Sequence, residues 1–269
     1  MYKLLGLTGK EEIARITNAV ISHLPALKTE DTTSILSSFA KIRHRDFRLF
    51  SALVEHLEAG KDIPLGEARV IIHSFSKIYF TNSNLTNRCA DIVKSNVNLI
   101  RPKDACNLLH SFTRLRYDDP ILLEQLISIA RDSLHDLDDV SLANFAIGSA
   151  KSNVIDDTVM LICQEIKARS PKLGPLESLR ALLALAHFST NGEAVDAAAA
   201  IVKGLNCNLL SLLQLTLALE AVTAIGCEYA DKIATALSRK RDSYTSVPHD
   251  LDMRIQAALK NMQTGRKQE

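Results

Sequence analysis

SFAKIRHRDF (residues 38–47) recurs as SFSKIYFTNS (residues 74–83) and again as SFTRLRYDDP (residues 111–120). In each phrase the small residue that follows phenylalanine can serve as a marker of the repeat. The successive markers are Ala40, Ser76, Thr113, Ala150, Ala186 and Ala221. They lie 36, 37, 37, 36 and 35 residues apart. A regular period of this size indicates stacked supersecondary units.

Each unit contains two stretches in which apolar residues recur at i, i+3, i+4 and i+7, as in amphipathic helices. The first, helix A, ends near the marker, and the second, helix B, follows a short turn. Residues with a side-chain oxygen that can cap helix B stand six positions after the first four markers: Asp46, Asn82, Asp119 and Asp156. Helix B is therefore expected to begin near these residues, and near Gly192 and Cys227 in the last two units. Proline falls near the expected start of four A-type helices, at positions 64, 102, 175 and 248.

These features predict an all-α fold, an α-solenoid of about six helical hairpins of 35–37 residues with a half-repeat at each end. The repeats are expected at residues 31–64, 65–101, 102–137, 138–174, 175–207 and 208–247, with half-repeats at 11–24 and 250–262. Residues 1–262 would form one domain whose A helices line a single surface, and residues 263–269 a flexible tail. The scarcity of aromatic residues, 5% with no tryptophan, suits closely packed helices.

The five cysteines form no CxxC pair and no Cys/His group with zinc spacing, so neither a metal nor another cofactor is expected. We interpret them as buried small apolar residues of a protein in a reducing compartment. No secretory signal peptide is recognised at the start of the chain. The apolar stretch 209–226 contains Gln214 and Glu220 and is short for a membrane span, so a buried helix is expected there and no membrane contact.

Helical pairs of about 37 residues, with a Phe–small–Lys phrase ending helix A and Asp or Asn before helix B, resemble the organellar helical-repeat proteins. The most similar are the heptatricopeptide repeats of alveolate mitochondria and the related octotricopeptide and FAST-kinase-like repeats. The resemblance covers roughly residues 31–240 and is strongest in the first four units. It implies RNA binding, often in the organellar ribosome, and a mitochondrial matrix location, with plastid or cytoplasm as alternatives. Many members end in a RAP domain, for which no room is expected after residue 240, so nuclease-like activity is not implied.

One residue after the first four markers stands a cation: Lys41, Lys77, Arg114 and Lys151. Such a ladder could contact RNA phosphates, one per repeat, or could only stabilise the C-terminal ends of the A helices. Further candidates for phosphate contact lie in the A–B turns, at Arg43, Arg45 and Arg116. Four polar side chains one or two helical turns before the ladder are candidates for reading base edges: His73, His110, Asn107 and Asn144. The alternatives are an ordinary solvated groove, or histidines that are hydrogen-bonded between neighbouring repeats.

Charge is distributed unevenly, although the net charge is only +1. Residues 38–117 carry a net charge of +6, residues 118–165 of −8 and residues 166–269 of +3. A free-standing RNA-binding protein is usually more basic, so this balance favours a chain that works inside an assembly. The apolar segment 195–226 is a candidate surface for a neighbouring protein. Its contact residues would be Leu209, Leu212, Leu213 and Leu217.

No signature of catalysis is found. The S-x-x-K matches at residues 38–41 and 74–77 are by-products of the repeat, because no S-D-N or K-T-G accompanies them. The sequence thus predicts a non-catalytic RNA-contacting protein of an organellar RNA–protein assembly, most concretely a mitochondrial ribosome subunit. One alternative is a protein-only scaffold that grips a partner segment in its concave groove, and another is a stand-alone RNA stability or processing factor.

Overall fold

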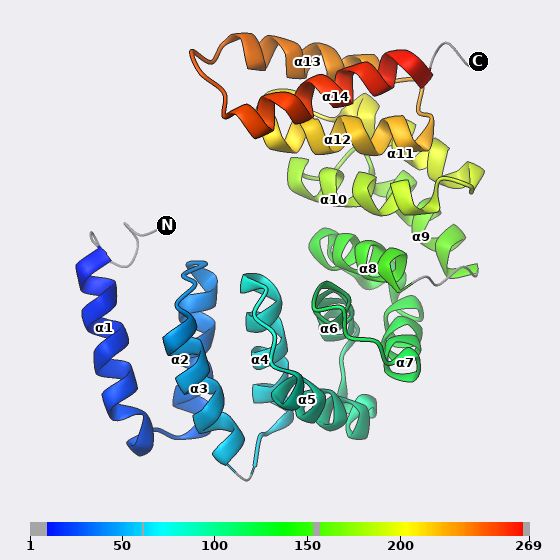
Figure 1. The fold of residues 1–269 in the computed structure, drawn as a ribbon. Coiled ribbons are helices and arrows are strands. Elements are labelled where there is room, and N and C mark those ends of the chain that lie inside the picture. Colours follow the sequence, from blue (N-terminus) through cyan, green and yellow to red (C-terminus); the bar gives the residue numbers. More distant parts are fainter. Residues whose placement is uncertain (1–9, 61, 153–156, 266–269) are drawn as a thin grey trace. The chain divides into compact units, whose positions relative to one another are not determined.

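The computed structural model describes residues 10–60, 62–152 and 157–265 (Figure 1). Within these ranges every regular element is a helix and no strand is found. The prediction of an all-α fold is therefore confirmed.

The helices follow the predicted A and B alternation. The A-type helices are α2 (Thr29–Lys41), α4 (Leu65–Ile78), α6 (Pro102–Arg114), α8 (Asp139–Lys151), α10 (Pro175–Leu185), α12 (Leu212–Ile225) and α14 (His249–Gly265). The B-type helices are α1 (Lys10–His23), α3 (Phe47–Ala59), α5 (Ser83–Ser95), α7 (Pro120–Arg131), α9 (Asp157–Arg169), α11 (Gly192–Gly204) and α13 (Ala230–Asp242). Short 3-10 helices lie in the connections: η2 (Leu24–Ala26), η3 (Val97–Leu99), η4 (Leu134–Asp136), η5 (Ala186–Phe188) and η6 (Cys207–Leu209).

The helices α1 and α14 lie where the two half-repeats are expected. The predicted tail, however, begins too early, because α14 continues through Gly265. The Thr264 hydroxyl donates to the carbonyl of Asn261 (2.9 Å) inside this last turn, and no residue that breaks a helix occurs before Gly265. Residues 266–269 lie outside the described part of the chain.

The predicted capping residues begin the B helices. Side-chain oxygens of Asp46, Asn82 and Asp119 accept the backbone N–H three residues later, at 3.1, 2.8 and 3.1 Å. Asp156 lies outside the described residues, and α9 begins directly after it at Asp157. Gly192 is the first residue of α11, as expected, whereas α13 begins three residues after Cys227.

A closed turn joins helix A to helix B in several repeats. A backbone N–H donates to the carbonyl five residues earlier in His44→Phe39 (3.1 Å), Phe80→Phe75 (3.1 Å), Tyr117→Phe112 (3.0 Å) and Cys227→Val222 (3.0 Å). This is the hydrogen bond of a Schellman motif, which requires a left-handed residue beside it. The left-handed residues are Arg43, Tyr79, Arg116 and Gly226, with φ of 54°, 54°, 57° and 75°.

The position of this bond corrects the sixth marker. Cys227 and Val222 stand where Tyr117 and Phe112 stand in the third repeat, so the equivalent of Thr113 is Thr223, two residues beyond Ala221. The sequence frame was wrong there because no phenylalanine fixes it in EAVTAIGC. With Thr223 as the marker, α13 begins seven residues after it. The same distance separates marker and helix B in the first four repeats.

The chain forms two compact units, residues 1–129 and residues 130–269. In the first unit α2 packs on α4 and α4 on α6, while α1 packs on α3 and α3 on α5. In the second unit α8, α10, α12 and α14 pack in succession, and α9, α11 and α13 do the same (Figure 1). Each A helix thus contacts the A helix of the next repeat within its unit. One continuous stack through residues 1–262 stays a prediction.

A single apolar position of the repeat forms the centre of both units. The residue four positions before the corrected marker is fully buried in all six repeats, and these residues are Leu36, Ile72, Leu109, Ala146, Leu182 and Leu219. All five cysteines are buried free thiols, as expected. Burial raises the pKa of both Cys89 and Cys163 to about 12, so these thiols remain protonated and behave as small apolar groups.

Cationic side chains connect one repeat to the next on the B-helix side. Arg88 of α5 donates to the carbonyls of Leu57 (3.4 Å) and Gly60 (2.8 Å), which end the preceding helix B. Lys232 of α13 donates to the carbonyls of Val202 (2.7 Å) and Lys203 (2.8 Å) at the end of α11. Each contact supplies donors to C-terminal carbonyls that have no partner within their own helix.

Replacing Arg88 with alanine should therefore destabilise the first unit. The loss should be about 1.5–3 kcal/mol, because charged donors to otherwise unpaired carbonyls are removed. Hydrogen exchange of the α3 and α5 amides under mild denaturant measures it. Exposed Arg15 of α1 provides the control, since Arg15→Ala should change the stability by less than about 0.5 kcal/mol. Equal protection in both variants would contradict a clamping role for Arg88.

The closed turn can be tested with two glycines. A methyl group added at Gly226 or at Gly66 meets no atom within 4 Å, but only Gly226 has positive φ. Gly226→Ala should cost about 1 kcal/mol of unfolding free energy because of the left-handed backbone. Gly66→Ala, in the first turn of α4, should be neutral or stabilise by up to about 1 kcal/mol. Urea unfolding monitored by circular dichroism measures both, and equal effects would contradict the assigned turn geometry.

Candidate nucleic-acid interface

Three cations of the predicted ladder lie at the same end of consecutive A helices. Lys41 is the last residue of α2, Lys77 the second-last of α4, and Arg114 the last of α6. Because α2 packs on α4 and α4 on α6, equal repeat position brings these side chains into one row. Lys151, the fourth member, is exposed at the end of α8 in the second unit.

The left-handed residues of the A–B turns form a second row beside the first. Arg43, Tyr79 and Arg116 occupy equal repeat positions, three residues after their markers, and all three are exposed. The Tyr79 ring of this second row lies close to two arginines. The guanidinium carbon of Arg114 is 4.2 Å from its centroid, and that of Arg45 is 5.4 Å away. We refer to Lys41, Arg43, Arg45, Lys77, Tyr79 and Arg114 as the basic cluster.

Electrostatic repulsion within the basic cluster is visible at Lys77. The pKa of this ammonium is lowered, first by desolvation and then by the positive charges of Lys41 and Arg43. A cation that only completes a helix C-terminus is stabilised by the carbonyls of that end. At Lys77 desolvation and like charge outweigh this effect, so a bound anion would relieve an unfavourable arrangement.

A polar hollow of about 440 Å³ adjoins the basic cluster between α2, α4 and α6. Its lining includes Ser37, Val70, His73, Asn107 and Ser111. Ser37, His73 and Asn107 come from one face of three successive helices, as the repeat predicted. Neutral donors and acceptors on this face are suited to the edge of an unpaired base.

The two carboxylates that line the same hollow both have partners. Buried Asp104 forms ion pairs with Arg69 and with Arg101, the latter at 2.9 Å. The Thr33 hydroxyl donates to Glu67. Asp104 therefore serves mainly to join α4 to α6, and it repels an incoming anion less than an unpaired carboxylate would.

His73 lies at the boundary between the hollow and the basic cluster. Its Nδ1 is 3.4 Å from the Ser111 hydroxyl of α6, so the alternative of a histidine hydrogen-bonded between repeats is supported. The residue is exposed as a whole, yet its pKa is lowered to about 4, first by desolvation of the ring and then by the positive charges of Lys77, Arg114 and Lys41. His73 is thus neutral at pH 7.

Other predicted residues are not presented to solvent in the same way. Asn144 is only 8% exposed within α8, so little of its amide is offered to a ligand, and a base contact there stays a prediction. His110 is half-buried.

In the second unit Leu209 and Leu213 are exposed and Leu217 is half-buried, but Leu212 is buried against its own unit. Leu212 is therefore part of the core and not of a contact surface.

The sequence interpretation missed Tyr79, although a signal for it exists. When the three phrases are aligned, Tyr79 occupies the same position as Arg43 and Arg116. This is the left-handed position of the closed turn, where the side chain is exposed to solvent. Tyr79 is a large aromatic residue that is 59% exposed and lies close to two arginines.

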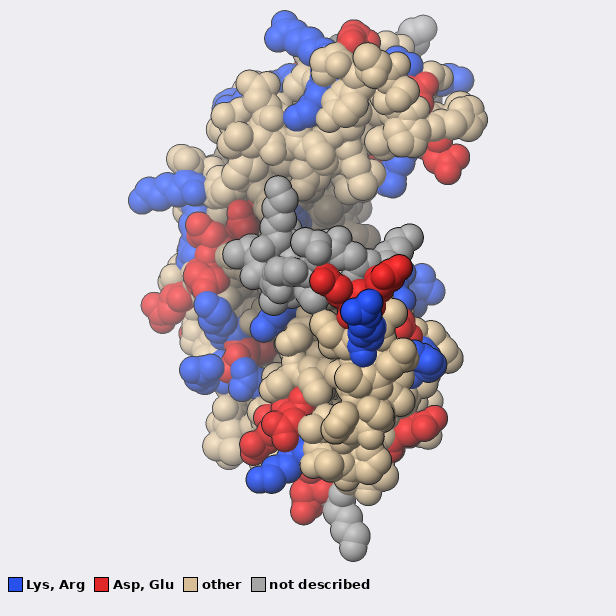
Figure 2. All heavy atoms as spheres, turned by 90° about the vertical axis from the view of Figure 1, so that its left-hand side faces the viewer, with Lys and Arg blue, Asp and Glu red and all other residues tan. Residues whose placement is uncertain are grey.

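One face of the molecule carries charges of both signs. On the face shown in Figure 2, which looks onto the α1 end of Figure 1, Lys and Arg side chains are interspersed with Asp and Glu. This face therefore shows no extended positive surface. The crowded cations of the basic cluster contrast with this mixed arrangement.

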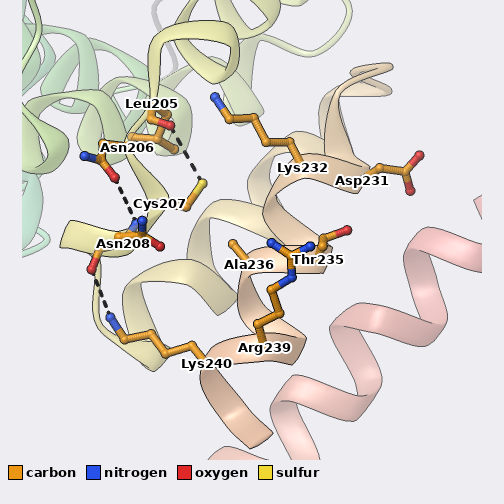
Figure 3. Close-up of a pocket in the computed structure, with 10 residues that line it drawn as sticks. All are labelled: Leu205, Asn206, Cys207, Asn208, Asp231, Lys232, Thr235, Ala236, Arg239 and Lys240. Carbon is orange, nitrogen blue, oxygen red and sulfur yellow. Dashed lines mark hydrogen bonds between the residues drawn. The ribbon is translucent and has the colours of Figure 1, made fainter. Parts of the chain in front are cut away.

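A larger hollow of about 730 Å³ lies in the second unit, between the η6 loop and α13 (Figure 3). Lys232 and Lys240 line it, and both donate to backbone carbonyls, Lys240 to those of Asn208 and Leu210 at 3.2 and 2.5 Å. Asn206 caps η6 through the N–H of Asn208 (3.2 Å). These contacts hold the loop against α13, so the two lysines have a structural role.

Among the residues that the structure describes, no group of three or more His, Cys, Asp or Glu is placed to hold a metal ion. In the same residues no helix combines the length and apolar character that crossing a membrane requires. The class defined by fold and site is an all-helical protein with a basic, aromatic-containing cluster on its first unit. No model of a known protein family matches the chain, and no curated protein is found that is similar to it.

The lowered pKa of His73 predicts a dependence of stability on pH. Between about pH 6.5 and about pH 4 the unfolded chain binds a proton at this residue that the folded chain does not. Stability should therefore fall as the pH decreases through this range, and the fall should be smaller in His73→Asn. Urea midpoints of both proteins at a series of pH values measure the difference. If the urea midpoints of the two proteins changed in parallel with pH, the His73 ring would not be desolvated in the folded chain.

Proposed function

We propose that this protein is a non-catalytic RNA-binding α-solenoid of an organellar RNA–protein assembly, most concretely a mitochondrial ribosome subunit. The observation that carries the proposal is the basic cluster at the ends of α2, α4 and α6, placed beside a polar hollow on the same helices. Cations at a regular spacing suit the regular charges of a phosphate backbone. The hollow suits a base edge, and the two together suit RNA better than an isolated anion.

The balance of charges supports a role within an assembly. A net charge of +1 provides little long-range attraction for RNA, so the basic cluster would act on an RNA that other contacts already hold nearby. The organellar setting rests on the resemblance of the repeats, and the mitochondrial matrix is its most concrete form. The same setting agrees with five reduced, buried cysteines.

A protein-only scaffold is the second candidate, and one observation favours it. The second residue of α8, α10 and α12 is an exposed apolar residue in each case: Val140 (45%), Leu176 (48%) and Leu213 (45%). Since these helices pack in succession, the three side chains form an apolar row on the second unit. In a protein-only scaffold this row would contact a neighbouring protein.

The ladder can be tested by its dependence on salt. A single-stranded RNA of about 16 nucleotides should bind the full chain with an affinity that falls steeply between about 50 and 200 mM salt. Lys77→Ala should weaken binding similarly for different sequences and reduce the slope of log K against log salt by roughly 0.7. Fluorescence anisotropy measures both, and Arg239→Ala, an exposed cation of the second unit, is the control.

Helix capping predicts another result. If Lys77 only stabilised the end of α4, Lys77→Ala would lower stability by a few tenths of a kcal/mol and leave RNA affinity unchanged. Removal of like charge next to Lys41 and Arg43 should instead leave stability equal or increased. Unchanged RNA binding in both Lys77→Ala and Arg114→Ala would contradict the ladder.

A further inference from the structure

Tyr79 carries an exposed aromatic side chain that the fold does not require. Its neighbour Phe80 makes the packing contacts of this turn, with ring centroids 5.2 Å from Phe75 and 5.6 Å from Phe50. Tyr79 itself is 59% exposed and has φ of 54°, which a residue with a side chain adopts only at a cost in free energy. The equivalent position of the last repeat is Gly226, so the turn does not need a side chain there. Tyr79 therefore adds an exposed aromatic ring that the turn itself does not require.

The cations around Tyr79 give this ring a particular environment. Arg114 lies over it at 4.2 Å, a distance typical of a cation–π contact that orders both side chains. Arg45 is farther away, at 5.4 Å, and is exposed, so it can move aside without loss of buried contacts. Lys77 belongs to the same cluster and lies two residues before the ring. The ring is thus held at one side and surrounded by groups that bind phosphate.

An exposed aromatic ring inside a cationic groove is the arrangement that binds unpaired bases. Bases stack on such rings while the neighbouring cations hold the phosphates on either side, and the stacking tolerates different sequences because every base has a flat face. In a duplex the faces of the bases are already stacked on each other and cannot reach a side chain. A ring at this position would therefore distinguish single-stranded RNA from duplex RNA, which cations alone do poorly.

We propose that Tyr79 stacks on one unpaired base of a single-stranded or looped RNA, and that Arg114 and Arg45 contact the phosphates next to that base. This inference rests on the proposed RNA-binding function and names the form of RNA that the basic cluster takes. The base edge would then be directed toward the neutral groups of the hollow, where His73 and Asn107 lie. An acidic protein segment would satisfy the cations but would leave the ring without a stacking partner.

The test compares the full-length chain with Tyr79→Ala, Tyr79→Phe and Tyr244→Ala. Tyr244 is the matched control because it is also an exposed tyrosine, 50% accessible, in the second unit. The probes are a single-stranded RNA of about 16 nucleotides and the blunt duplex formed with its complement. Alanine retains the left-handed strain of tyrosine, so equal melting temperatures are expected and affinity can be compared directly.

Tyr79→Ala should bind the single strand roughly ten-fold more weakly, the size expected for the loss of one stacked base, with an unchanged salt slope. Tyr79→Phe and Tyr244→Ala should bind like the unmodified protein. The duplex should bind more weakly than the single strand and respond little to Tyr79→Ala. Photocrosslinking of a 5-iodouridine-containing strand should map to Tyr79, since a stacked ring reacts preferentially.

Two failures can be distinguished. If the unmodified chain binds neither RNA in a salt-dependent way, the proposed function fails and the stacking inference fails with it. If the chain binds RNA but Tyr79→Ala binds the single strand equally well, only the stacking inference is overturned. It is also overturned if poly-glutamate displaces the RNA completely and binds both proteins equally, because the site would then accept an acidic protein segment.

Discussion

The closed turn between helix A and helix B is the constraint on which the rest of this structure depends. One backbone bond, from the residue after the left-handed position to the carbonyl five residues earlier, fixes where helix A ends. An aromatic pair covers that bond in three repeats, with ring centroids 5.7, 5.2 and 5.1 Å apart. Because the turn has a fixed length, helix B begins seven residues after the marker in five of the six repeats. The turn thus keeps the spacing between helix A and helix B constant in these repeats.

A fixed turn alone does not hold successive hairpins together, and two kinds of contact do so here. On the A side, one fully buried apolar position per repeat lets each A helix pack on the next within its unit. On the B side, Arg88, Arg169 and Lys232 reach the carbonyls that end the preceding repeat. Burial provides most of the stabilisation. The clamps satisfy polar groups that would otherwise lie unpaired at the junctions.

Most of the fold could be predicted from the sequence because the period, the caps and the prolines all act locally. The sequence is less informative where such local signals are missing. The helices α8 and α12 are apolar on nearly every side, so nothing in their pattern shows that Asn144 and Leu212 are buried while Leu213 is exposed. The clamps stand at different places in their repeats, so the period does not reveal them. That the first three ladder cations lie side by side, and that Ser37, His73 and Asn107 share one face, could be predicted. Residues at the same position of successive repeats lie at the same height on helices that pack together.

The same turn that closes each hairpin also determines which side chains can form a site. A left-handed residue at the end of a helix cannot direct its side chain into the helix packing, so at Arg43, Tyr79 and Arg116 it is exposed to solvent. Three stacked turns thus present three side chains next to the last cations of three helices. Two of the three are arginines and the middle one is an aromatic ring. The pKa of Lys77 is lowered first by desolvation and then by the charges of Lys41 and Arg43, and a bound polyanion would offset those charges. The exposed ring among these cations therefore supports the proposal of a ligand that is both negatively charged and flat.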